Sequence, residues 1–150
     1  MSMHYSVFTD YGIVVDEPLM RAILQEYTKY HPDDEEILQE LQTESVEEVF
    51  RNLFEDNENL FVTGILEGKV YEYGPDGRLN DDAALDINYS EMFIMLLLDK
   101  APSLFGVAPY SCVEDALSEI REKSFDNTGR VKIPASYPLR LAYVEGVRFG

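Results

Sequence analysis

The segment between Asp16 and Phe54 carries three successive helical patterns, and it constrains the fold more than any other part of the chain. Asp16 is expected to cap the first helix, because a carboxylate at that position accepts a bond from a free backbone N–H. The helix is expected to end before Pro32, since the residue ahead of a proline disfavours helical geometry. Its apolar residues, spaced for one buried stripe, are Leu19, Met20, Ile23, Leu24 and Tyr27.

Two capping-box patterns follow the first helix. Asp33 with Glu36, and Ser45 with Glu48, each place an acceptor three residues before an acid. Ser is the usual cap of this motif, so the second pair is the stronger signal. The apolar residues of the two helices are Ile37, Leu38 and Leu41, then Val46, Val49, Phe50, Leu53 and Phe54.

Strand-like segments lie on both sides of this helical block. Residues 5–15 are rich in β-branched and aromatic side chains and predict one strand, or two strands broken near residues 10–12. Residues 60–66 and 69–73 predict a hairpin turning at Glu67 and Gly68. Residues 74–77, Gly-Pro-Asp-Gly, have the composition of a tight turn.

The second half of the chain is less regular. Residues 83–89 fit a further strand, and residues 90–100 fit either a helix or a buried strand. Ser90, as a cap, favours the helix. Residues 111–123 predict another helix, with a turn at 126–129 and a final strand over 139–149.

These elements predict one α+β domain over residues 1–150, with an antiparallel sheet packed by several amphipathic helices. Hydrophobic residues make up 45% of the chain and aromatic residues 12%, which is enough for a core and argues against disorder. The longest apolar run, residues 92–98, is too short to span a bilayer. The start of the chain shows no secretory signal, and a single cysteine fits a reducing compartment, so we expect a cytoplasmic location.

The chain has a formal net charge of −17, and the charge is unevenly placed. Residues 1–60 hold 15 acidic and 3 basic residues, whereas residues 101–150 hold 6 of each. A field of this sign repels nucleic acid and anionic membranes and attracts basic protein surfaces. The expected partner is therefore a basic protein surface, with no direct binding of nucleic acid or membrane.

The acids of the second and third helices are the candidate binding site. Carboxylates spread over a helical face can imitate the charge spacing of a nucleic-acid backbone and occupy a basic groove. The alternative is a solvated surface that keeps the protein soluble. The residues expected to bind the partner are Asp34, Glu35, Glu40, Glu44 and Glu47.

Asp76, Asp81, Asp82 and Asp86 form the densest acidic cluster outside the helices. Hard cations take oxygen ligands, so a metal site is conceivable there. The calcium-loop template fails because its sixth position, Asp81, requires glycine. We therefore interpret the cluster as an acidic loop and expect no metal site.

The remaining reactive side chains show no catalytic pattern. His4 and His31 have no partner at metal-ligand spacing, and His31 is expected at a helix C-terminus, which suits a cation. Cys112 would need a nearby base to act as a nucleophile; it lies at the start of a predicted helix and is expected to be a small buried residue. No phosphate-binding loop, dinucleotide fingerprint or nucleophile elbow is present, so no cofactor is expected.

Three functions are compatible with these observations. The favoured one is a non-catalytic acidic protein that inhibits or modulates a basic, nucleic-acid-binding protein. In size and acidity the chain resembles small acidic bacterial or phage proteins that act on nucleic-acid machinery, a resemblance of composition that assigns no residue. The second is a structural or assembly protein whose acidity serves solubility. The third and least favoured is an enzyme using Asp81, Asp82 or Asp86 on a hard cation.

Overall fold

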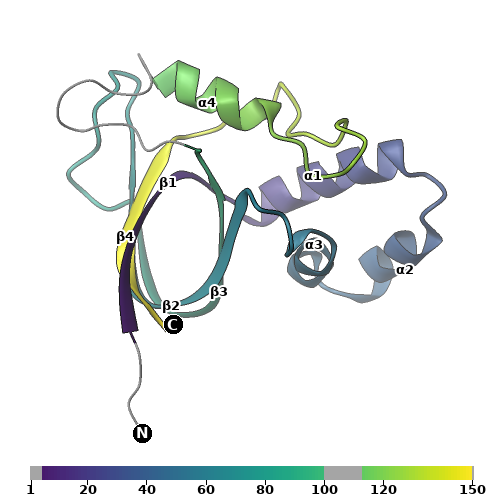
Figure 1. The fold of residues 1–150 in the computed structure, drawn as a ribbon, viewed down its shortest axis with the longest axis horizontal. Coiled ribbons are helices and arrows are strands. Elements are labelled where there is room, and N and C mark those ends of the chain that lie inside the picture. The colour runs from purple at the N-terminus through teal and green to yellow at the C-terminus, as the bar shows by residue number, and fades with distance from the viewer. Residues whose placement is uncertain (1–4, 100–112, 150) are drawn as a thin grey trace, which may run out of the picture.

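The computed structural model describes residues 5–99 and 113–149, which form four helices and four strands (Figure 1). An α+β fold with an antiparallel sheet is confirmed. Within the described part of the chain, no helix combines the length and apolar character needed to cross a membrane. The elements are β1 (Tyr5–Val14), α1 (Glu17–Tyr30), α2 (Glu35–Thr43), α3 (Val46–Phe54), β2 (Leu60–Glu72), β3 (Leu85–Leu97), α4 (Val113–Glu122) and β4 (Ala142–Phe149).

The four strands close into a small barrel in the order β1-β3-β2-β4, and every neighbouring pair is antiparallel. β2 pairs with β3 along one edge and with β4 along the other. The barrel is closed by a short pairing in which residues 12–14 of β1 meet residues 95–97 of β3. Gly12 permits that approach, because a Cβ there would overlap the backbone oxygen of Leu96.

The sheet separates two apolar cores. One lies inside the barrel, and the larger one lies between the outer side of the barrel and the helices. β3 contributes to both, since Phe93 and Met95 belong to the inner core while Ile94 and Leu96 belong to the outer core. The inner core consists of Phe8, Ile65, Val70, Ile87, Phe93, Met95, Ala142 and Val144.

The helices are arranged beside the barrel (Figure 1). α1 and α3 pack against each other, α2 packs against α3, and α2 lies farthest from the barrel. The five stripe residues predicted for α1 are all buried, as are Val49, Phe50 and Phe54 of α3. α2 is attached more loosely, because Ile37 is its only buried residue.

The helix caps were predicted correctly at two of three positions. Asp16 Oδ1 accepts the Leu19 N–H at 3.0 Å, and Ser45 Oγ accepts the Glu48 N–H at 3.2 Å. The prediction that Asp33 caps α2 was wrong. Asp34 is the cap, and its Oδ1 accepts the Ile37 N–H at 3.2 Å. The helix begins one residue later than its capping-box spacing indicated.

The predicted hairpin at Glu67 and Gly68 is wrong. Residues 60–72 form one continuous strand, and Gly68 lies in its middle, paired with both β3 and β4. A Cβ at Gly68 would lie 3.1 Å from the Glu145 backbone oxygen, so close packing between strands explains this glycine better than a turn does. The turn at residues 74–77 is confirmed, with Gly77 at a φ of 79°.

The prediction of a helix over residues 90–100 is also wrong. Residues 85–97 form the single strand β3, and the Ser90 hydroxyl donates to the Met92 backbone oxygen at 2.6 Å instead of capping a helix. The apolar run is continuous because both faces of this strand are buried. The helix predicted over 111–123 is found as α4, and residues 111 and 112 lie outside the described residues.

Candidate functional site: the acidic helical layer

Three glutamates spaced four residues apart form a line along α2: Glu36, Glu40 and Glu44, called here the acidic ridge. Side chains four apart lie on one side of a helix, so these carboxylates are neighbours. Residues 31–50 contain eight acidic residues and no Lys or Arg, so the sequence around the ridge supplies no opposite charge. Within the described residues, none of the three glutamates forms an ion pair.

At its C-terminal end the acidic ridge works against its own helix. Partial burial raises the pKa of Glu40, and the carboxylates of Glu44 and Glu36 raise it further. Glu44 is the C-cap of α2, where the negative end of the helix dipole disfavours an acid. No basic residue lies in the last turn of the helix to compensate.

Sequence reasoning assigned Asp34 to partner binding, but in the structure this residue has a role in holding the fold together. Besides capping α2, its Oδ2 accepts the Tyr27 hydroxyl at 2.7 Å, which ties α2 to α1. Burial, together with that bond to Asp34, raises the pKa of Tyr27 to about 12. Because Asp34 holds two helices in place, a change there would alter the fold as well as the charge.

Glu35 and Glu47 are exposed and lie in the first turns of α2 and α3. An acid in the first turn is favoured by the helix dipole, so folding alone accounts for these two. Of the five predicted binding residues, Glu40 and Glu44 are brought together on the ridge. Sequence reasoning missed Glu36 as their third member, although the four-residue spacing was visible in the sequence.

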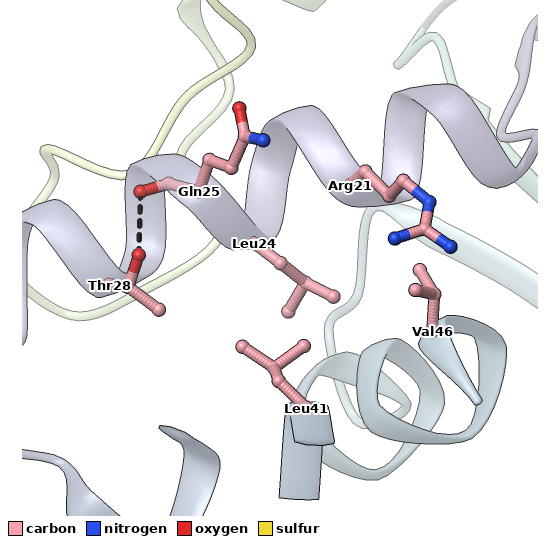
Figure 2. Close-up of a pocket in the computed structure, with 6 residues that line it drawn as sticks. All are labelled: Arg21, Leu24, Gln25, Thr28, Leu41 and Val46. Carbon is pink, nitrogen blue, oxygen red and sulfur yellow. Dashed lines mark hydrogen bonds between the residues drawn. The ribbon is translucent and has the colours of Figure 1, made fainter. Parts of the chain in front are cut away.

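A hollow of about 230 Å³, called here the helical groove, opens between α1 and the α2–α3 connection. Figure 2 shows Leu24 of α1 and Leu41 of α2 pointing toward each other across it, with Val46 near the Arg21 guanidinium. Thr28 also lines the groove, and its hydroxyl is occupied by a 2.9 Å bond to the Gln25 backbone oxygen. The groove therefore has an apolar floor and lies next to strongly acidic helices.

A polar contact of a different kind lies at the end of α1. His31 Nε2 lies 2.7 Å from Asp126 Oδ2, and the His31 ring stacks on Tyr27 with centroids 4.4 Å apart. His31 is the C-cap of α1, as predicted, but its pairing with Asp126 was not predicted. No local pattern signals a contact between residues so far apart in sequence.

The acidic side chains within residues 76–86 do not converge on a common point where a cation could bind. Asp76, Asp81, Asp82 and Asp86 are all exposed. Across residues 5–99 and 113–149, no group of three or more His, Cys, Asp or Glu side chains is arranged to hold a metal ion. The interpretations of His4 and Cys112 lie outside the described residues.

Comparison with protein-family models, curated proteins and solved structures finds no match to this chain. The functional argument therefore rests on the acidic helical layer itself.

Proposed function

We propose that this chain is a non-catalytic binding protein whose α2 and α3 acids engage a basic surface of another protein. The observation that carries the proposal is the acidic ridge, three neighbouring carboxylates without a counter-charge on a helix that they destabilise. Each like-charged pair four residues apart costs an isolated helix about 0.2–0.5 kcal/mol. A basic partner would turn this repulsion into attraction.

A purely solubilising surface does not require such an arrangement. Net charge keeps a protein soluble wherever the charges lie, and acids are tolerated best in first turns, where Glu35, Glu36 and Glu47 lie. The ridge places Glu44 where local rules disfavour it. Natural proteins break local rules mainly at functional sites, which supports a binding role for α2.

The partner that fits best is a nucleic-acid-binding protein with a basic groove. Its groove is built to receive regularly spaced negative charges, which the carboxylates of α2 and α3 would imitate. Direct binding to nucleic acid is disfavoured by the charge of −17. A cytoplasmic location, which rests on the single cysteine, belongs to the same proposal.

One observation favours a second candidate, a structural or assembly protein. Val7 and Tyr89 are 81% and 74% exposed, which is high for an aliphatic and an aromatic side chain on strands. Self-association through these strands would cover them, and the acidity would then serve solubility. This candidate predicts association that does not depend on the α2 acids.

The test is affinity capture from the host lysate at low and moderate salt, followed by binding measurements with the purified partner. Reversing the three ridge residues Glu36, Glu40 and Glu44 to Lys should abolish binding, and added nucleic acid should displace the protein. Asp34 is left unchanged because it caps α2. Reversing Asp81, Asp82 and Asp86 to Lys changes the net charge equally and serves as the control. A partner whose binding is insensitive both to salt and to the ridge reversals would overturn the proposal.

A further inference from the structure

We infer that the helical groove receives an aliphatic side chain, such as Leu or Met, from a lysine-rich segment of the partner protein. This inference rests on the proposed function and specifies the class of partner. The groove supplies an apolar contact and the acids of α2 supply the charge contact. Such pairing of an anchor side chain with a charged rim is common at protein interfaces.

The size of the groove suits one side chain. Small-molecule pockets are usually roughly 300–1,000 Å³, and they enclose most of their ligand. The helical groove holds about 230 Å³ and is bounded by Leu24 and Leu41 on its two walls. Leu24 is only 2% exposed and Leu41 is half-buried, so the α1 wall is fixed to the core while the α2 wall is accessible.

The charge around the groove selects the occupant. Leu41 follows Glu40 directly, and Glu44 lies between Leu41 and Val46 in sequence. Among the described residues that line the groove, Arg21 is the only base, and it is already paired with Glu17 at 2.8 Å. α2, which forms one wall of the groove through Leu41, also carries Glu40 and has Glu44 as its C-cap, so the residues that flank an inserted aliphatic side chain pass along an acidic helix. Lysine or arginine is complementary at those flanking positions.

The same charge argues against a second copy of this chain as the occupant. Residues 1–60 carry five times as many acidic as basic residues, so two copies would place like charges against each other at this face. The exposed aliphatic Val7 also lies on β1, which has no basic residue to offer the ridge.

The experiment compares two synthetic lysine-rich peptides, one with a central leucine and one with serine in its place. The leucine peptide should bind roughly tenfold more tightly, because burying a leucine side chain is favourable by an amount of that order. The methyl NMR signals of Leu24, Leu41 and Val46 should shift with the leucine peptide and not with the serine peptide.

Two threonine variants provide a matched pair. Thr28→Leu fills the groove and should remove the preference for leucine, whereas Thr43→Leu, on the exposed end of α2, should keep it. Each of the two hydroxyls donates to a backbone oxygen of its own helix, so the two changes are alike locally. Circular dichroism and melting temperature verify that both variants fold.

The remaining outcomes separate this inference from the proposed function. Equal, salt-sensitive binding of both peptides that is lost on reversal of Glu36, Glu40 and Glu44 would overturn the groove inference and leave the acidic binding proposal standing. Failure of both peptides to bind at low salt would overturn both. Dimerisation of the protein that Thr28→Leu abolishes would identify a second copy as the occupant and overturn the inference.

Discussion

His31 and Asp126 are 95 positions apart in sequence, and their side chains meet at 2.7 Å between Nε2 and Oδ2. The contact joins the C-terminal end of α1 to the turn that follows α4. On its other side the His31 ring stacks on Tyr27, whose hydroxyl donates to Asp34 at the start of α2. This row of four side chains fixes the ends of α1 and α2 against the rest of the domain.

Replacing Asp126 with Asn should lower the free energy of unfolding by about 2 kcal/mol, the usual loss for a hydrogen bond to a charged group. The Asp126 side chain is only 9% exposed, so water compensates little. Chemical denaturation of the purified variant measures the loss. Asn127→Ala, at the exposed neighbouring position, serves as the control and should leave stability nearly unchanged. Equal stability of Asp126→Asn and wild type would contradict the assigned role.

The contribution of Asp126 to the free energy of unfolding should decrease as the pH falls. Burial raises its pKa, but hydrogen bonds from His31, Thr128, the Val131 N–H and Ser124 outweigh burial and lower the pKa from 3.8 to about 2. The unfolded chain therefore takes up this proton before the folded protein does. The stability difference between wild type and Asp126→Asn should be complete above about pH 4 and disappear as the pH falls toward 2. A difference that stays constant over this range would show that the carboxylate charge is not involved.

The outer core should depend on Phe50. This side chain is 1% exposed and makes edge contacts with Phe54 and Phe125, at centroid distances of 5.0 and 6.4 Å. Phe50→Ala should lower the free energy of unfolding by about 3–5 kcal/mol. Leu38→Ala on α2 should cost only a small part of that, because Leu38 is 38% exposed. Similar losses for the two variants would mean that the core is not centred on Phe50.

The helices were predictable because their signals are local. The caps at Asp16 and Ser45 and the apolar stripe of α1 all lie within a few residues of the structure they specify. The α2 cap was predicted one residue too early, at Asp33 instead of Asp34, because the local signal does not distinguish the two residues. Two adjacent aspartates offer equivalent caps, and the contact of Asp34 with Tyr27 of another helix distinguishes them.

The strands were less predictable because their patterns depend on distant neighbours. The apolar run in β3 has no alternation, since one face packs inside the barrel and the other against the helices. Gly68 resembled a turn residue because only the neighbouring strand explains why a side chain is absent there. Likewise, the charge of α2 was evident in the sequence, whereas the groove and the Asp126 contact required the packing of separate elements.

Close contact between β2 and β4 should make Gly146 intolerant of a side chain. A Cβ at Gly146 would overlap the Glu67 backbone oxygen and lie 2.8 Å from the Gly68 Cα. Gly146→Ala should therefore lower the melting temperature clearly, because backbone on both strands must shift. Gly64→Ala is the comparison, since its nearest neighbour lies 3.3 Å from the added Cβ. If Gly146→Ala melts at or above the Gly64→Ala temperature, the barrel is more open at this point than described.

Metal ions should have only a general effect on stability. Asp81, Asp82 and Asp86 are exposed and are not gathered around a common point, so chelator should leave the melting temperature unchanged. Any rise in melting temperature caused by millimolar Mg²⁺ or Ca²⁺ comes from screening of the repulsion among the acids, so it should persist in Asp82→Asn. A rise of several degrees that Asp82→Asn removes would reveal a specific cation site.

Two identical substitutions at opposite helix ends should have opposite effects. Glu44→Lys removes an acid from the ridge and puts a cation at the C-terminus of α2, so the free energy of unfolding should rise by about 0.5 kcal/mol. Glu47→Lys puts the same cation in the first turn of α3 and should lower it by a similar amount. Denaturation at low salt measures both, and high salt should reduce both differences. A stabilising Glu44→Lys that also weakens partner binding would show that α2 gives up stability for its acidic ridge. Loss of stability in both variants would contradict the claim that Glu44 opposes its own helix.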